Sequence, residues 1–189
     1  MTCLSTITLD GTGFTTVSTG SGTVGYSGGV LTMTPAVAAD PGTTYGAWVL
    51  YDTPAQDFLI SVTSTTVSQS RTGSPPNAWE RFWLFFNYTV PIATKETNYV
   101  TVKTNGLELG KAYDSVGQTF LDTPATPTLA VGITSTWLLR KVGTSIWLNV
   151  SGGVTYEYTG SIYNVSGKIG FYTEDAIVTV SDFKFASLD

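Results

Sequence analysis

The stretch Trp137–Tyr158, WLLRKVGTSIWLNVSGGVTYEY, decides the fold class of this chain. Apolar and polar residues alternate in it with a period of two, as they do in half-buried strands. Val142-Gly143 and Ser151-Gly152-Gly153 interrupt the alternation with short turn sequences. The stretch therefore predicts three consecutive antiparallel strands joined by two tight turns.

The turns also predict which residues face each other. The first turn places Leu139 opposite Ile146, and the second places Trp147 opposite Glu157. A slip of one residue in the second pairing would bury Glu157, so this register is favoured. Trp147 is then expected to point away from the core.

The same turn-punctuated alternation continues along the chain. Asn105-Gly106 is a strong hairpin signal and predicts Lys103 opposite Glu108, a pair of opposite charges. About a dozen strands are expected, and the candidates are Leu4–Leu9, Phe14–Ser18, Val30–Met33, Tyr45–Tyr51, Phe58–Val67, Glu80–Thr89, Thr97–Thr104, Leu107–Tyr113, Trp137–Lys141, Ser145–Val150, Val154–Tyr158, Lys168–Tyr172 and Ala176–Phe185.

Composition agrees with an all-β fold. The 189 residues suit one domain that covers residues 1–189, and only 12% of them are charged, about half the usual share. Thr, Ser and Gly fill the difference, and Thr favours strands while Gly marks turns. The expected architecture is an antiparallel two-sheet β-sandwich of the jelly-roll type.

Several classes of function are excluded by what the sequence lacks. The net charge is −5 with nine basic residues, so we expect no nucleic-acid partner. Histidine is absent, which removes Ser-His-Asp catalysis and histidine metal sites. Cys3 is the single cysteine, so no intrachain disulfide forms. No apolar run is long enough to span a membrane or follows a basic N-terminus as in a signal peptide.

The outward faces of the expected strands combine aromatic rings with amides and charges. In Glu80–Thr89, one face carries Phe82, Leu84, Phe86 and Tyr88, and we assign it to the core because the other carries Arg81 and Asn87. Sugar-binding sites need flat aromatic surfaces beside such polar groups. The candidate ligand-binding residues are Arg81, Trp83, Asn87, Tyr99, Lys103, Glu108, Arg140, Trp147, Asn149 and Glu157. The alternative is that these faces are buried under a loop or a partner subunit.

Paired carboxylates would allow glycoside hydrolysis, and Glu108 and Glu157 are candidates that share a face in this interpretation. Glu108 already has a partner in Lys103, and no tight acidic motif occurs, so no catalytic residue is assigned. No cofactor is expected. A structural calcium ion is a minority alternative, with Asp10 and Asp182 among the acidic residues that offer oxygen ligands.

Three segments carry a resemblance to a known family. They are NAWERFWLFFNYTV with KETNYVTVKTNGLELGKAYDSVGQ, the hairpin WLLRKVG…IWLNV, and the closing GKIGFYTED and VSDFKF. Their order resembles the concanavalin A-like lectin/glucanase superfamily, in its laminin-G-like and sugar-hydrolase-like branches, over the last two-thirds of the chain. The resemblance implies two antiparallel sheets, one curved, with ligands on the concave face. It also implies a calcium ligand near Asp182 in calcium-bearing members. The catalytic acidic motif of the glucanase branch is missing.

The sequence thus predicts a domain that binds a glycan or polysaccharide through an aromatic-rich concave face without catalysing a reaction. Its expected location is extracellular or on a virion or particle surface. Two alternatives stay open: a structural or decoration protein that takes part in self- or capsid assembly, and a polysaccharide-degrading enzyme.

Overall fold

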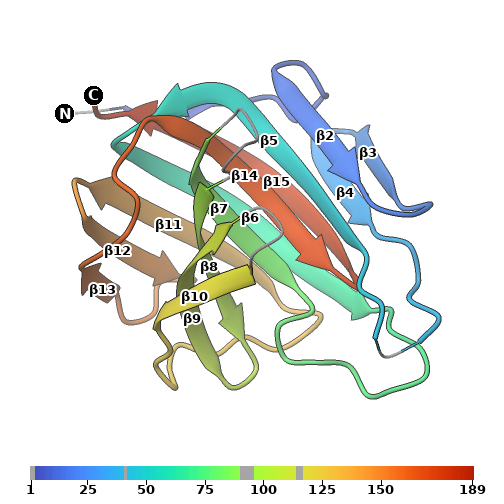
Figure 1. Ribbon diagram of the computed structural model, residues 1–189. Helices are drawn as coiled ribbons and strands as arrows, with labels where there is room; N and C mark the ends of the chain where they lie inside the picture. The colour runs from blue at the N-terminus through green and yellow to red at the C-terminus, as the bar shows by residue number, and fades with distance from the viewer. Residues whose placement is uncertain (1–2, 41, 90–95, 114–116) are drawn as a thin grey trace.

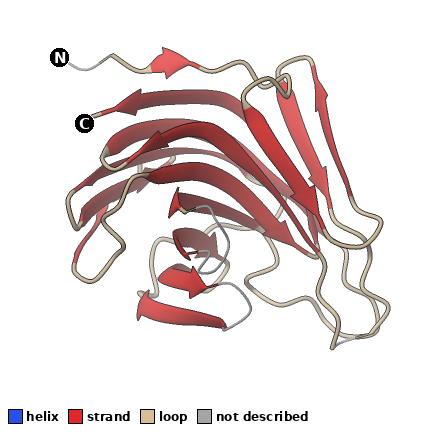
Figure 2. Cartoon of the chain, turned by 45° about the horizontal axis from the view of Figure 1, so that its top comes forward, coloured by secondary structure: helices blue, strands red, loops and turns tan. Residues whose placement is uncertain are grey.

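The computed structural model describes residues 3–40, 42–89, 96–113 and 117–189. Two antiparallel sheets pack face to face in it, and no helix occurs within these ranges (Figures 1 and 2). The described residues accordingly include no helix that is long and apolar enough to cross a membrane. The predicted all-β, two-sheet antiparallel sandwich is confirmed.

Each sheet mixes strands from distant parts of the sequence. In sheet A, β1 (Ser5–Thr6) pairs with β15, and the main order is β13 (Tyr156–Thr159), β12 (Ser145–Val150), β11 (Thr134–Val142), β6 (Phe58–Gln69), β15 (Ala176–Ser187), β4 (Val30–Thr34) and β3 (Thr23–Ser27). The order in sheet B is β10 (Gly117–Asp122), β9 (Gly106–Tyr113), β8 (Glu96–Lys103), β7 (Phe82–Tyr88), β14 (Gly167–Glu174), β5 (Gly46–Ala55) and β2 (Phe14–Ser18).

The core lies between the two sheets and consists of the inward residues of alternating strands. Burial alternates along β11 and β12, as the period of two requires. Phe82 of sheet B meets Trp137 of sheet A edge to face, with ring centroids 5.1 Å apart. Both rings are almost fully buried, and each such side chain stabilises the fold by about 1.5–3 kcal/mol.

The turn at Ser151–Gly153 has the predicted register. Trp147 lies opposite Glu157, and Leu148 lies opposite Tyr156. Leu148 is buried while Trp147 is only half-buried, so the predicted facing of this strand is confirmed.

The register predicted for the preceding hairpin is wrong by two residues. Leu139 pairs with Leu148, and Lys141 pairs with Ile146 on the core side. Lys141 tolerates burial because its Nζ donates to the carbonyl of Gln56 at 2.8 Å and forms an ion pair with Asp57 at 3.1 Å. A shift of two residues leaves every side chain on its predicted face.

The Asn105-Gly106 hairpin is shifted in the same way. Lys103 lies opposite Gly106 instead of Glu108, so the turn is Thr104-Asn105. Gly106 has a φ of 137° and lies against the backbone of Pro124, where no side chain would fit. The predicted ion pair between Lys103 and Glu108 still forms diagonally, with Nζ and Oε2 2.6 Å apart.

Candidate functional site

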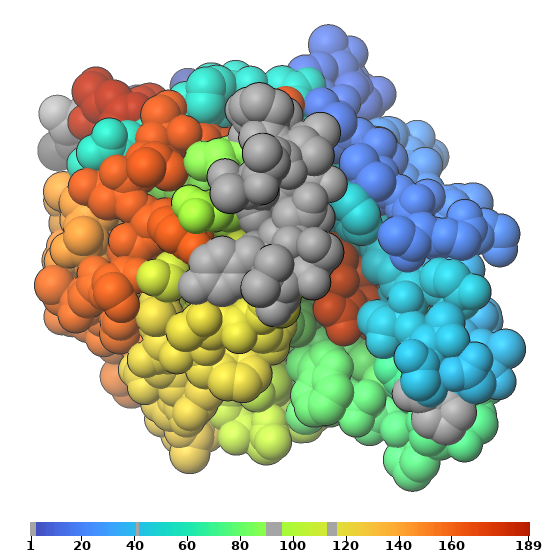
Figure 3. Space-filling model, viewed as in Figure 1, coloured from blue at the N-terminus to red at the C-terminus, as the bar shows by residue number. Residues whose placement is uncertain are grey.

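A pocket of about 360 Å³ opens on the outer face of sheet B, on the side of the molecule shown in Figure 3. Strands β10 and β14 both contribute to it, although three other strands lie between them in the sheet. Sheet B must therefore curve with its outer face concave, as the arched strands in Figure 2 show. The lining residues are Trp79, Trp83, Lys103, Glu108, Gln118, Phe120, Thr123 and Glu174.

Packed aromatic rings form the floor of this face. Trp83 and Tyr99 are almost fully buried, with ring centroids 4.8 Å apart. Tyr172 meets Trp83 edge to face at 5.8 Å and stacks on Phe85 at 4.9 Å with an interplanar angle of 20°. These contacts hold the rings in single orientations, so the floor is preorganised.

Gly110 makes room for part of this floor. The ring and hydroxyl of Tyr99 occupy the space that a Cβ at position 110 would need. In this position the Tyr99 hydroxyl donates to Oε1 of Glu108 at 3.0 Å. Burial and the neighbouring carboxylate raise the pKa of Tyr99, so the phenol stays protonated and remains a donor.

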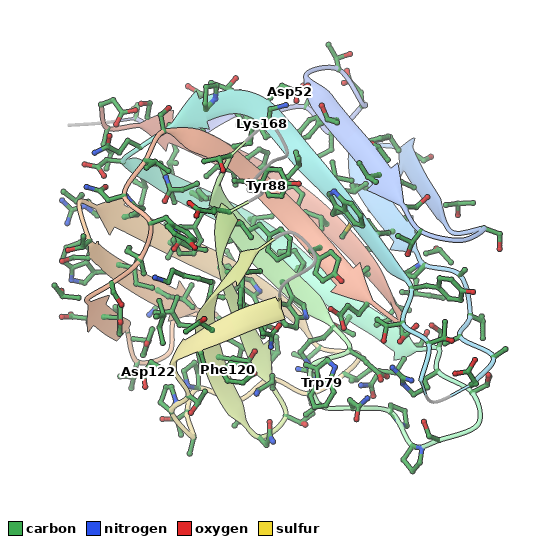
Figure 4. All side chains as sticks on the ribbon, in the orientation of Figure 1. Asp52, Trp79, Tyr88, Phe120, Asp122 and Lys168 are labelled. Atoms are coloured by element: carbon green, nitrogen blue, oxygen red, sulfur yellow. The ribbon has the colours of Figure 1, made fainter. Side chains whose placement is uncertain are left out.

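Two aromatic residues at the rim are open to solvent. Trp79 is 42% exposed and Phe120 is 57% exposed, and Figure 4 shows both at the same end of the sheet. The carbonyl of Trp79 accepts a 2.7 Å hydrogen bond from the indole of Trp83, which ties the rim to the floor. A ligand can thus reach the rim rings without displacing the core.

The two carboxyl groups of the pocket, Glu108 and Glu174, have different partners. Glu108 is neutralised by Lys103 at 2.6 Å, whereas Glu174 accepts a 2.8 Å hydrogen bond from Tyr172. Burial raises the pKa of Glu174, and the charges of Asp175 and Glu80 raise it further. The pocket therefore combines one neutralised ion pair with one carboxyl that resists ionisation.

A buried charge cluster supports Glu174 from behind. Arg71 contacts Glu80 at 2.5 Å and Asp175 at 2.7 Å, and all three side chains are nearly inaccessible. Asn77 donates to the same oxygen of Glu80 at 2.9 Å. This cluster holds the loop before β7 against the end of β14, so it positions Trp79 and Glu174 on either side of the pocket.

The structure brings only part of the predicted set together. Trp83, Lys103 and Glu108 line the pocket, and Tyr99 lies beneath it. The remaining outward residues occupy the outer face of sheet A, on the opposite side of the sandwich: Arg140, Trp147, Asn149 and Glu157. The expectation that Glu108 and Glu157 share a face is wrong, because their strands belong to different sheets.

Two further predicted residues are buried and do not line the pocket. Arg81 directs Nη1 to the carbonyls of Val102 and Leu129 at 2.8 and 2.7 Å. Asn87 has a φ of 53°, which breaks the alternation at the end of β7. Its amide nitrogen donates to three carbonyls, those of Ala55, Gln56 and Val165. Both side chains donate to backbone carbonyls of neighbouring strands and loops, which a strand pattern cannot reveal.

Sequence reasoning missed the other half of the pocket: Trp79, Gln118, Phe120, Thr123 and Glu174. Gln118 and Phe120 lie on β10, which is not among the predicted strands. Trp79 lies in the loop before β7. The alternation of β14 does place Glu174 on the same face as Tyr172, and that signal could have identified it.

In the described part of the chain, the structure shows no metal site at the two predicted calcium ligands, Asp10 and Asp182. Asp10 is engaged in a local turn, where its Oδ1 accepts from the amide of Thr12 at 2.8 Å. Asp182 lies at a bulge of β15 with a φ of 50°. Among the described residues, no three His, Cys, Asp or Glu side chains form a group that could hold a metal ion. A calcium ion at Asp10 or Asp182 stays a prediction from the sequence.

The sequence matches no family model and no curated protein. Its fold does match solved structures. The carbohydrate-binding module CBM66 from Bacillus subtilis superposes with a TM-score of 0.68 at 16% identity, over 93% of this chain and 96% of that one.

Two further matches cover nearly the whole chain. The β-glucanase of Bacillus licheniformis has a TM-score of 0.62 at 12% identity over 98% of both chains. The exoplasmic/lumenal domain of VIP36, in a form bound to Ca²⁺ and Man3GlcNAc, has a TM-score of 0.61 at 8% identity, over 99% of this chain and 91% of that one. These similarities confirm the predicted resemblance at the level of architecture: the chain has the concanavalin A-like jelly-roll fold.

Proposed function

We propose that the protein binds a carbohydrate in the pocket on the outer face of sheet B and does not hydrolyse it. The observation that carries this proposal is that one pocket is lined both by solvent-exposed aromatic rings, Trp79 and Phe120, and by polar side chains. Sugar rings offer apolar C–H faces to aromatic rings and hydroxyls to carboxylates and amides. Glu108 and Gln118 supply those polar partners.

The fold comparisons support carbohydrate binding in general terms, because a carbohydrate-binding module and a glycan-bound lectin domain share this architecture. A volume of about 360 Å³ lies near the lower end of the range for small-molecule sites, so we infer that the pocket takes one or two sugar rings. Polysaccharides occur mainly outside cells, so an extracellular location remains our prediction.

Binding to a panel of soluble polysaccharides tests the proposal, with Trp79→Ala as the diagnostic variant. Because Trp79 lies at the rim, its removal should spare the fold and weaken binding about tenfold or more. Trp147→Ala is the matched control, since it removes a half-buried Trp from sheet A. If Trp147→Ala abolishes binding and Trp79→Ala does not, the site lies on sheet A and the proposal is wrong.

Hydrolysis is the second candidate, favoured by the presence of two carboxyl groups in one pocket and by the glucanase match. Glu108 and Glu174 lie on strands separated by two others, so their backbones are about 14 Å apart in the sheet. Glycosidase carboxyl pairs need about 5–9.5 Å, and both side chains would have to converge. This arrangement favours binding over hydrolysis. If the wild type releases reducing ends from a polysaccharide and Glu108→Gln does not, the protein is a hydrolase and the binding proposal is wrong.

Assembly into a particle stays a prediction from the sequence. A measured solution mass separates it from the binding proposal, because a chain that works alone has a mass of 20.1 kDa.

A further inference from the structure

Among the described residues, one carboxyl group that lines the pocket has no cationic partner. Lys103 is committed to Glu108 at 2.6 Å. In the part of the chain that the structure describes, Glu174 has a hydrogen bond from Tyr172 and no ion pair. Glu174 is therefore the lining carboxyl with which a cationic ligand could still pair, and the ligand's charge would favour the ionised form of Glu174.

The charge of Arg71 acts on Glu174, but Arg71 is already paired with two other carboxyl groups. Arg71 divides its guanidinium between Glu80 and Asp175, which leaves three carboxyl groups and one cation at this end of the pocket. Oε2 of Glu80 is buried and has no hydrogen-bond partner among the described residues. The surplus makes this wall attractive to a cation and repellent to an anion.

The aromatic lining also favours a cation in this pocket. Trp79 lines the pocket together with Glu174 and is 42% exposed, and indole faces attract ammonium groups through their quadrupole. An ammonium group beside Glu174 would meet a carboxyl that is shielded from water, where charge pairs are screened less than at the surface. A negatively charged sugar, such as a uronate, would face uncompensated repulsion there.

We propose that the preferred ligand is a sugar with a free amino group, whose ammonium pairs with Glu174 while its ring lies against Trp79. This inference rests on the proposed function, because it assigns the ligand class of the same pocket. Glu174 is the specificity-determining residue, and Trp79 serves every sugar that binds.

The experiment compares three oligosaccharides of equal length and linkage: β-1,4-linked glucosamine, N-acetylglucosamine and glucose. Calorimetric titration at about pH 6 keeps the amine charged. The wild type should bind the glucosamine oligomer about tenfold or more tighter than either neutral oligomer. Glu174→Gln, which keeps the shape of the side chain, should bind all three with similar affinity.

Glu157→Gln is the matched control, because it removes one negative charge from the exposed face of sheet A and should keep the preference. Equal binding of the three oligomers by the wild type would overturn the inference and leave the proposed function standing. A preference that survives in Glu174→Gln would also overturn it. If none of the three oligomers or the polysaccharide panel binds, the proposed function itself fails. The comparison within the wild type decides the question even if Glu174→Gln does not fold.

Discussion

The outer faces of the two sheets carry similar residues but arrange them differently. On sheet B, Trp83 and Tyr99 are buried in a floor beneath a pocket, and the rim rings stand open above it. On sheet A, Arg140 lies over the ring of Trp147 at 4.8 Å, so one side chain covers the other. Further along sheet A, threonines pair across the strands, as Thr65 and Thr134 do at 2.8 Å.

Curvature accounts for the difference. Where sheet B bends, outward side chains from β10 and β14 converge on one space, although three strands separate them. On sheet A, the outward side chains satisfy their nearest cross-strand neighbours. An aromatic residue next to charges therefore lines a pocket only where the sheet bends around it. The following predictions test this contrast, from the largest expected effect to the smallest.

The largest difference in stability between the two faces is expected when a tryptophan is removed from each. Trp83→Ala should lower the free energy of unfolding by about 3–5 kcal/mol, because it leaves a cavity under the pocket. Trp147→Ala should cost about 1 kcal/mol, mainly its contact with Arg140. Urea denaturation measures both. Leu148→Ala, a core control one residue away, should cost about 2–5 kcal/mol. Equal losses for the two tryptophan variants would contradict the contrast.

A glycine substitution on each sheet gives the next largest difference. Gly110→Ala should destabilise the protein by about 1–3 kcal/mol, because the new Cβ displaces Tyr99 and breaks its hydrogen bond to Glu108. Gly25→Ala on β3 meets open space and should change stability by less than about 1 kcal/mol. Thermal melts of the two variants provide the measurement. A mild Gly110→Ala would show that the floor can rearrange and is not preorganised.

The smallest expected effect concerns pH. The pKa of Glu174 is raised by burial, so the folded chain holds this proton more tightly than the unfolded chain. Its contribution to stability is therefore fully present below the ordinary value of 4.5 and is lost as the pH rises through the raised value. Glu174→Gln should show a smaller loss of unfolding free energy than the wild type between acid and neutral pH.

Denaturation curves at several pH values check this, and Glu157→Gln on sheet A serves as the control. Glu157 is exposed, and its replacement should leave the pH profile of the wild type unchanged. A profile for Glu174→Gln that coincides with the wild type would mean that the fold does not raise the pKa of Glu174.

In the two shifted hairpins, the sequence predicts the facing of the side chains correctly but not the pairing register. Both wrong registers are shifted by an even number of residues, so Leu148 still faces the core and Trp147 still faces out. Tertiary contacts accompany both shifts: Gly106 lies against Pro124, and Lys141 forms an ion pair with Asp57. These partners lie 18 and 84 residues away along the chain.

The sequence by itself determined the β-sandwich and the inward or outward direction of most strand residues, because alternation with a period of two is a local property of the chain. The tertiary structure alone decided which sheet each strand joins, and thus that Glu108 meets Glu174 in one pocket while Glu157 lies on the opposite face. It also decided that Arg81 is buried against backbone carbonyls. Strand order and curvature arise from pairings between distant segments, and those pairings leave no periodic trace in the sequence.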